Sequence, residues 1–353
     1  MARVLTLSAA LVVSIESVVA AQAPGDPISA RDFGASGSEH QRTAATTEGA
    51  RDVTVTDVGD FQVGQGVMVS RCNIRVSGAL WGPESPYSSR KDLGDAAELR
   101  GHDGAVGSWL VYILEVDGAD PLTFRWSDDL ARTWAATKVP VSFDWQALSN
   151  GIEVKINARD LQVGNMLTFS LRDQLVTRIE KIEGNVLTLA DAANRSAQDA
   201  VIIHNDQVAL QAAVDAAIQQ KRNLYIPPGQ YRLSGTVRVA NAAIAIEGQS
   251  PENTVLDIQD GSGACLALQG GDEVTVRNLR MIGHTGMAEA AGSFRTSSGH
   301  GFWACALKGC NAITISGTER VLIENVHASR MASEAFYAQW PCRTSTEEPK
   351  QYQ

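Results

Sequence analysis

The sequence lacks any basic run and any apolar stretch long enough to cross a bilayer. Its 353 residues include 30 Lys and Arg against 40 Asp and Glu, which gives a formal net charge of −10. Nucleic-acid-binding proteins carry basic patches or stripes, so nucleic acid is not expected as a partner. A transmembrane helix needs about 20 apolar residues, so no membrane span is expected either.

Closely spaced cysteines are also missing. The chain has five cysteines, none in a C-x-x-C pair, and the odd number leaves at least one thiol unpaired within the chain. This spacing excludes a zinc site of the usual kind. No cluster of aspartates marks a calcium site, so metal ligands stay unassigned.

Residues 1–21 are typical of a secretory signal peptide. Arg3 is followed by the apolar run Val4–Val13 and by small residues up to Ala21, the arrangement of a cleavable signal. Glu16 departs from the pattern, and a mature N-terminal helix is the alternative. We expect a secreted or periplasmic protein.

Two segments one hundred residues apart resemble each other. DFQVGQGVMVS (Asp60–Ser70) aligns with DLQVGNMLTFS (Asp160–Ser170), and both are typical of strand, turn and strand. Gly64 and Gly164 suit a positive φ in the two turns. Chance similarity is the alternative to two related halves of a small β module, at about residues 50–75 and 150–203.

The residues between these halves, about 76–149, are rich in tryptophan. Ser127, Asp129, Thr133 and Trp134 fit the Asp-box pattern S-x-D-x-G-x-T-W, with Ala131 in place of glycine. A single Asp-box predicts a fastened hairpin rather than sialidase activity. The tryptophans could form a sugar-stacking face or the core of a small sandwich, and we favour the core.

After residue 204 the pattern changes to one helix and many short strands. The helix places apolar residues on one face, with Asn205 or Asp206 as N-cap. DEVTVRNLRMIG (Asp272–Gly283) then superposes on ERVLIENVHASR (Glu319–Arg330) at an offset of 47. AAIAIEGQS (Ala242–Ser250) precedes the first of these by 30. Such repeats predict a solenoid.

This register separates inward from outward side chains. Arg277, Glu324 and Glu247 alternate with inward apolar residues, and Gly248, Asn278 and Asn325 fall on one corner. Glycine and asparagine tolerate the left-handed conformation that such a corner needs. We predict an all-β fold, a right-handed parallel β-helix.

The chain resembles the pectate lyase-like superfamily in three motifs. Asp32–Ala35 is a DFGA segment, Asp206–Ala217 matches D-x-x-A-x-Q-x-A-x-D-A-A, and Tyr225–Tyr231 is a YIPPGxY turn. The resemblance implies a β-helix whose first segment, residues 30–37, continues in a capping helix and coils at residues 204–353. Residues 38–203 are then a nested β-rich insertion, which a fold tolerates where both ends of the gap lie close together.

The chain has few coils for this superfamily. About four are visible, and the polar ending after residue 340 has no strand pattern. Natural solenoids cover their terminal coils. We therefore expect that residues 204–353 are truncated at the C-terminus and belong to a longer protein.

The resemblance implies activity on long, often uronic-acid-containing glycans. A lyase needs a base near the proton α to a carboxylate and a cation, Arg, Lys or Ca²⁺, for the developing enolate. A hydrolase needs two carboxylates across the glycosidic bond. GHG at Gly299–Gly301 resembles a polygalacturonase motif, but the N-x-D and D-D motifs that precede it in that family are missing.

Two outward columns and one loop carry the candidate site residues. Glu247, Arg277 and Glu324 share the first column, typical of a salt-bridge ladder, with Arg277 and Glu324 as candidate substrate-binding residues. Arg280 and His327 share the second column, with Arg330 three residues further on, and these three are the candidate catalytic residues, base and carboxylate clamp. Polar packing at the surface is the alternative interpretation of this column. The Gly/Ser-rich loop Gly283–Gly301 supplies further candidate substrate-binding residues: His284, Arg295 and His300.

The sequence thus predicts an exported polysaccharide lyase that cleaves a uronic-acid-containing glycan by β-elimination. A polygalacturonase-like hydrolase and a non-catalytic glycan-binding or structural β-helix are the alternatives. Ca²⁺ is the one cofactor that this chemistry suggests. The partner is a polysaccharide, and the oligomeric state is not specified by the sequence.

Overall fold

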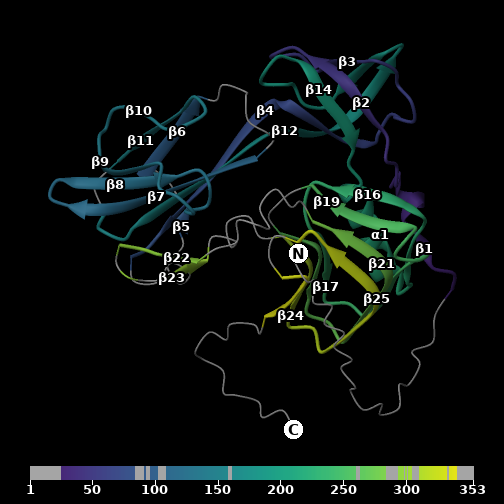
Figure 1. Cartoon of the computed structure of the whole chain (residues 1–353). Helices are drawn as coiled ribbons and strands as arrows, with labels where there is room; N and C mark the ends of the chain where they lie inside the picture. The colour runs from purple at the N-terminus through teal and green to yellow at the C-terminus, as the bar shows by residue number, and fades with distance from the viewer. Residues whose placement is uncertain are drawn as a thin grey trace, which may run out of the picture.

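The fold is mostly β. The computed structural model describes residues 25–83, 91–92, 96–101, 109–157, 161–259, 263–283, 293–297, 299, 301–303, 310–331 and 334–339. In these ranges the strands form parallel sheets around one core and two antiparallel modules from residues between 38 and 204 (Figure 1). No helix in them is long and apolar enough to cross a membrane.

Three parallel ladders make up the C-terminal part. The first contains β15 (Leu224–Ile226), β18 (Ile244–Gly248) and the first halves of β21 (Glu273–Ile282) and β25 (Arg320–Ser329). The second contains β16 (Gly229–Leu233), β19 (Thr254–Ile258) and the second halves of β21 and β25. The third contains β17 (Val237–Ala240), β20 (Gly263–Gln269), β24 (Cys310–Ser316) and β26 (Phe336–Gln339). The chain visits the three in rotation, so the parallel sheets curl around a shared core.

The predicted register is confirmed in β21 and β25. Val274 pairs with Val321 and Arg277 with Glu324, the offset of 47 read from the sequence. Asn278 and Asn325 take φ of 59° and 50°, and the Asn325 amide donates to Asn278 Oδ1 at 2.9 Å. Because asparagine tolerates the left-handed conformation, each strand turns this corner without interruption.

The prediction of a left-handed corner at Gly248 is wrong. Gly248 does not have a positive φ, and its strand ends there before a turn that leads to β19. A Cβ at Gly248 would lie 2.4 Å from the carbonyl oxygen of Asn278 and 2.9 Å from Thr254 Cβ. Glycine is therefore needed because the next coil packs closely on this backbone.

The helix α1 (Gln207–Gln220) covers one end of the core. Leu210, Ala213, Val214 and Ala217 are buried, and Leu210 and Val214 face Leu224 of the first coil across a small cavity. The N-terminal strand β1 (Ile28–Ser29) pairs in parallel with β15, and the 3₁₀ helix η1 (Ala30–Phe33) follows it. The DFGA segment therefore lies beside the helix that follows it by some 170 residues.

Asp206 joins these two segments. It is the N-cap of α1, as one of the two predicted candidates, but its carboxylate does not bond to the helix. Instead it accepts from Ser36 N at 2.5 Å, Ser36 Oγ at 3.0 Å and Gly37 N at 3.3 Å. The carbonyl of Gly37 in turn accepts from Gln230 N at 2.9 Å. The two ends of the intervening segment thus meet.

A closed barrel of six antiparallel strands, which the sequence pattern did not predict, follows Gly37. Each strand pairs with two others, in the closed order β4, β14, β2, β3, β13, β12 and back to β4. Their bounds are β2 (Gln41–Thr46), β3 (Asp52–Val55), β4 (Gly66–Trp81), β12 (Met166–Glu183), β13 (Val186–Leu189) and β14 (Ala197–His204). Phe61 and the inward aliphatic residues of all six strands fill the interior.

A second antiparallel module continues from the barrel because β4 and β12 are long enough to belong to both. Their far halves extend a sheet through β5 (Lys91–Asp92), β7 (Trp109–Ala119), β8 (Leu122–Ser127) and β9 (Ala136–Pro140). A three-stranded sheet of β6 (Ala97–Gly101), β10 (Gln146–Ala147) and β11 (Ile152–Ile156) supplies the second layer. Tyr112, Phe124 and Phe169 lie in the core of this sandwich module.

The repeated segments form the same turn at two places. Gln62 N donates to Gln65 Oε1 and Gln162 N to Asn165 Oδ1, both at 2.8 Å. Gly64 and Gly164 have positive φ, as predicted. The first turn leads into the barrel and the second into the sandwich module, because β4 runs antiparallel to residues Met166–Arg178 of β12.

Replacing the carboxylate at the junction should separate the two segments. We expect Asp206→Ala to lower the free energy of unfolding by about 1–3 kcal/mol, since it removes hydrogen bonds to a buried charged group. Urea unfolding followed by circular dichroism measures this. Asp215→Ala, at an exposed position of the same helix, is the control. Equal stability of the two variants would contradict a joining role for Asp206.

Candidate functional site

The outer face of the second ladder holds the predicted catalytic pair. One outward column contains Gln230, Val255, Arg280 and His327, each in register with the next. Arg280 and His327 are both exposed, and neighbouring strands lie about 4.8 Å apart. Within the described ranges neither side chain has a hydrogen-bond or ion-pair partner. A cation and an imidazole are therefore presented together to solvent.

Arg330 lies just beyond this pair. It follows the last residue of β25 and takes a left-handed conformation with φ of 57°. Its side chain is exposed, and its carbonyl faces Gly283, the residue after β21. The turn therefore places Arg330 at the end of the same ladder, outside the column of Arg280 and His327.

Glu252 is a neighbour that sequence reasoning missed. It is fully exposed in the turn between β18 and β19. A hydrogen bond from Ser250 holds the pKa of Glu252 below its usual value, and the charge of His327 lowers this pKa further. Its position depends on a turn without any repeat in the sequence, so no periodic signal could identify it.

The first column is partly an ion pair. Arg277 donates to Glu247 at 2.8 Å, and the Asn278 amide donates to the same carboxylate at 3.2 Å. Glu324 lies in register with Arg277 on the next coil and is exposed. These contacts form the Glu247–Arg277 part of the predicted ladder and leave Arg277 less free than Arg280 to bind a ligand.

Of the three predicted loop residues, the structure describes only Arg295. His284 and His300 lie outside the described residues. Arg295 ends the short strand β22 (Ser293–Arg295), which pairs with β23 (Gly301–Trp303). Its guanidinium donates to Gly299 O at 3.0 Å, and its carbonyl accepts from Arg125 of the sandwich module at 3.1 Å.

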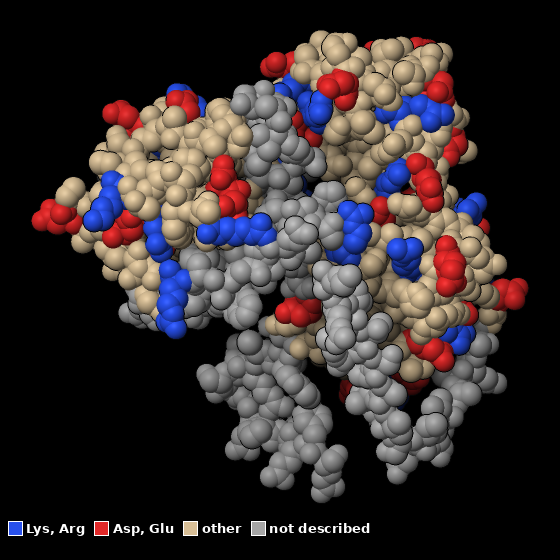
Figure 2. Space-filling model, in the orientation of Figure 1, with Lys and Arg blue, Asp and Glu red and all other residues tan. Residues whose placement is uncertain are grey.

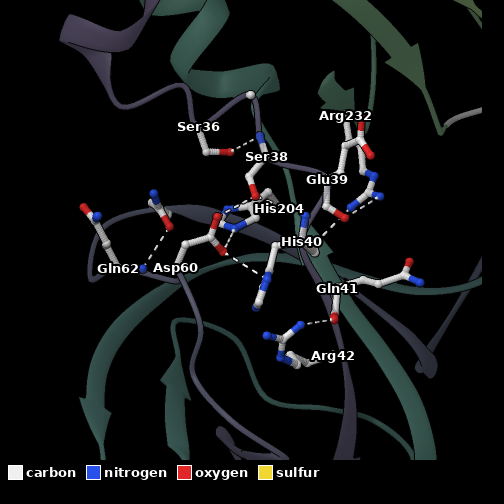
Figure 3. A network of polar contacts seen from close by, with 12 residues as sticks. Ser36, Ser38, Glu39, His40, Gln41, Arg42, Asp60, Gln62, His204 and Arg232 are labelled. Carbon is white, nitrogen blue, oxygen red and sulfur yellow. Dashed lines mark hydrogen bonds and ion pairs between the residues drawn. The ribbon is translucent and has the colours of Figure 1, made fainter. Parts of the chain in front are cut away.

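A second polar cluster lies where the barrel joins the coils (Figure 3). Asp60 accepts from Ser38 Oγ at 2.5 Å and contacts His204 Nε2 at 3.0 Å and His40 Nδ1 at 3.6 Å. His204 is 1% exposed and stacks on Phe61 with 4.5 Å between ring centroids. The sequence pattern did not predict this cluster.

The same junction is tied to the second ladder. Arg232 of β16 donates to the carbonyls of His40 at 3.0 Å and Glu39 at 3.1 Å. Figure 3 shows Arg232 reaching the segment that enters the barrel. The cluster therefore acts as a joint between the barrel and the second ladder, and two of its ring nitrogens, His40 Nε2 and His204 Nδ1, are buried without a hydrogen-bond partner among the described residues.

A cleft of about 740 Å³ lies beside this joint, between the barrel and α1. Phe33, Val63 and Val208 line it with exposed apolar side chains. Its volume is in the range of ligand sites, about 300–1,000 Å³. Its charged lining residues, Arg178 and Asp191, are exposed, and Asp191 accepts from Thr177 at 2.8 Å. The cleft is a candidate binding surface without buried titratable groups in its lining.

The Asp-box is a hairpin fastener, as predicted. Asp129 accepts from Thr133 N at 3.0 Å and Thr133 Oγ1 at 2.6 Å, and Ser127 Oγ accepts from Ala131 N at 2.9 Å. Partial burial would raise the pKa of Asp129, but the hydrogen bonds from Ser127 and Thr133 lower it. Ala131 takes the left-handed φ of 58° that glycine would favour at this position.

The tryptophans of the sandwich module fit the core interpretation where their side chains are described. Trp81 and Trp126 are buried. Trp134 lies under the Arg125 guanidinium at 3.9 Å, and Trp145 lies under that of Arg100 at 4.2 Å. Two rings are therefore in the core, and two are covered on one face by arginine.

Thiol and metal chemistry find little support in the described ranges. Burial raises the pKa of the Cys72 thiol to about 11 and also raises the pKa of Cys265, whereas a reactive cysteine needs a lowered pKa. Cys305 and Cys342 lie outside the described residues. No three His, Cys, Asp or Glu side chains in these ranges are grouped to hold a metal ion, so a calcium ion remains a prediction.

No family model and no curated protein matches the chain. Several solved structures show a distant likeness. ORF18 of Geobacillus virus E2 is 14% identical over 34% of this chain and 22% of its own length, with a TM-score of 0.23. The mannuronan C-5 epimerase A-module of Azotobacter vinelandii is 17% identical over 38% of each chain, with a TM-score of 0.23.

A third likeness covers more of the chain. The GH87 α-1,3-glucanase catalytic unit of Streptomyces thermodiastaticus is 13% identical over 81% of this chain and 48% of its own, with a TM-score of 0.17. The chain spans less than half the length of each of these three proteins. Two of the three are carbohydrate-active enzymes, but TM-scores this low carry no argument about this chain.

The Asp60 cluster should make stability depend on pH. Partial burial would raise the pKa of Asp60, but bonds from Ser38 and His204 and the charges of His204 and His40 lower it. A lowered folded-state pKa stabilises the fold above the unfolded value, about 3.9, and this stabilisation is lost as pH falls through the folded value. We therefore expect Asp60→Asn to lower Tm at neutral pH, with a gap to wild type that narrows below about pH 4.

Thermal unfolding of both proteins between pH 3 and pH 7 measures this gap. Asp57→Asn is the control, because the Asp57 carboxylate is exposed where it pairs with Arg42 at 2.6 Å, and ion pairs at the surface contribute little. A gap for Asp60→Asn that stays constant over the whole range would contradict a role for its ionised form.

Proposed function

We propose that the coils form a right-handed parallel β-helix and that the protein is an exported polysaccharide lyase acting on a uronic-acid-containing glycan. One observation carries this proposal, the exposed Arg280 beside the exposed His327 on the outer face of the second ladder. An arginine can bind a carboxylate and stabilise the negative charge that develops on it. A neutral imidazole can accept a proton near neutral pH.

The two side chains have distinct roles in the proposed β-elimination. The Arg280 guanidinium binds the carboxylate of a uronate residue, and His327 accepts the proton from the carbon next to that carboxylate. The electron pair of the broken C–H bond forms a carbon–carbon double bond, and the glycosidic oxygen on the adjacent carbon leaves. This oxygen takes a proton from solvent. The products are a shortened glycan and an unsaturated uronate end.

Hydrolysis is less well supported. It needs two carboxylates about 5–10 Å apart on either side of the scissile bond. On the described outer face of the second ladder the acidic residue is Asp257, and its carboxylate accepts from Gln230 at 2.7 Å. Glycan binding through the tryptophan-rich region is also less well supported, because two of its described rings are buried and two carry an arginine on one face.

Replacement of either member of the pair should reduce lyase activity. We expect His327→Ala to lower kcat by about 100-fold or more, since proton transfer contributes about that factor. Arg280→Ala should lower kcat/KM by about 100-fold through the lost stabilisation of the enolate. The measurement is the ultraviolet absorbance of unsaturated uronate ends on a panel of uronic-acid polysaccharides.

The matched control is Arg320→Ala. Arg320 is an exposed arginine of the same strand, β25, and pairs with Glu273 at 3.2 Å. It should retain wild-type activity. Full activity of His327→Ala on a polysaccharide that the wild type cleaves would overturn the assignment of the base. Absence of unsaturated ends on every polysaccharide in the panel would overturn the proposed function.

A further inference from the structure

A hairpin from the coils docks on the sandwich module. β22 and β23 lie in the segment between β21 and β24 of the parallel sheets. Figure 1 shows this hairpin against the sandwich module, away from the sheets that precede and follow it in the sequence. Contacts at Arg295 and Ser297 join it to residues some 170 positions earlier in the chain.

Two charged side chains form the contact. Glu115 of β7 is 0% exposed, and Arg125 of β8 donates to its Oε2 from Nε at 2.9 Å and from a terminal nitrogen at 2.6 Å. The other carboxylate oxygen of Glu115 accepts from Ser297 N, and Arg125 also donates to the Arg295 carbonyl at 3.1 Å. We call these two residues the Glu115–Arg125 clasp.

The clasp favours one position of the hairpin on the sandwich module. A buried carboxylate is costly unless it is paired and its remaining lone pairs are satisfied. Arg125 provides the counter-charge, and its stacking on Trp134 holds the guanidinium plane in place. Main-chain groups of the hairpin complete the hydrogen bonds of both residues. The described contacts therefore hold the hairpin by its backbone at Arg295 and Ser297.

The segment that carries the hairpin starts at the candidate site. β21 bears Arg280 on its second half and ends two residues later at Ile282. The clasp accordingly holds a hairpin that follows the Arg280 strand, β21, in the sequence. The sandwich module is then linked to the parallel sheets at two places, through the barrel that shares β4 and β12 and through the hairpin.

We infer that the Glu115–Arg125 clasp positions the sandwich module as one wall of the polysaccharide-binding groove, so that the module contacts sugar units beyond those at Arg280 and His327. This inference rests on the proposed lyase function. A long glycan bound at Arg280 and His327 extends far enough to contact such a wall, whereas a short glycan does not. Glu115 and Arg125 are positioning residues, because they contact the hairpin and not the reacting atoms.

The double variant Glu115→Gln, Arg125→Met tests the inference. It removes both charges together, so no buried charge is left unpaired. We expect KM for a uronate polymer to rise about tenfold, since the variant weakens the two hydrogen bonds that hold the hairpin. We expect kcat on the polymer and kcat/KM on a uronate trisaccharide to stay within twofold of wild type.

The matched control is Arg100→Met, Glu153→Gln in the three-stranded sheet of the same module. This pair has an N···O distance of 2.7 Å, and Arg100 stacks on Trp145 as Arg125 does on Trp134. It lies on strands that do not pair with the hairpin. The control should leave the KM for polymer unchanged.

Hydrogen exchange separates failure of the clasp from failure of the proposed function. Backbone amides at residues 293–297 should exchange faster in the clasp variant than in wild type or the control, whether or not any glycan is cleaved. Unchanged exchange there would show that the clasp does not hold the hairpin. Faster exchange with an unchanged KM for polymer would overturn the module as a wall of the groove. An inactive wild type would overturn the lyase proposal alone.

Discussion

The carboxylate of Asp206 is the constraint on which the architecture depends. A buried carboxylate needs several donors, and the donors available to it are in Ser36 and Gly37, on the far side of a long excursion of the chain. Because these donors lie before the barrel, the chain must come back beside Ser36 and Gly37 before α1 begins. The parallel coils can then be continuous in space although the sequence that builds them is not. The barrel and the sandwich module are added without disturbing the register of β1 against β15.

Closure of the barrel explains why the fold tolerates residues 38–203 between the two segments that Asp206 joins. The barrel pairs each of its six strands on both sides, so it leaves no free edge of its own. Its first and last strands, β2 and β14, are also antiparallel partners, which places the two connections to the coils together at His40 and His204. The joint therefore follows from the barrel's own topology as much as from the coils that it enters.

The register of the parallel strands could be predicted from sequence and the barrel could not, for a physical reason. A parallel coil repeats its neighbour at a fixed offset, so the register of Val274 on Val321 and the corners at Asn278 and Asn325 are visible as periodicity. Antiparallel closure depends on pairs without such an offset, such as β3 with β13. The prediction of a left-handed corner at Gly248 failed for a related reason. Close packing requires a glycine there, and the repeat pattern alone does not distinguish that requirement from a left-handed conformation.

The residues of the candidate site could likewise be predicted only where they lie on repeated strands. Arg280 and His327 could be placed side by side because both are on repeated strands. Glu252 and the Glu115–Arg125 clasp could not, because a non-repeating turn and a contact between distant segments leave no periodic signal. The loop residues gave a mixed result, since Arg295 uses its backbone to contact the sandwich module rather than presenting its side chain in the column of Arg280.

Local charge pairing explains how a protein with a net negative charge could still bind an anionic polymer. Screening in physiological salt limits the effect of exposed charges to about 8 Å, so the net charge of −10 matters less than the immediate neighbours of a site. Figure 2 shows both signs interspersed over the described atoms of one side of the molecule. Arg277 is neutralised by Glu247, and Arg232 is bound to main-chain carbonyls. Arg280 is left without a partner in the described ranges, so in the proposed lyase it would recognise one carboxylate at a defined position rather than attract the glycan diffusely.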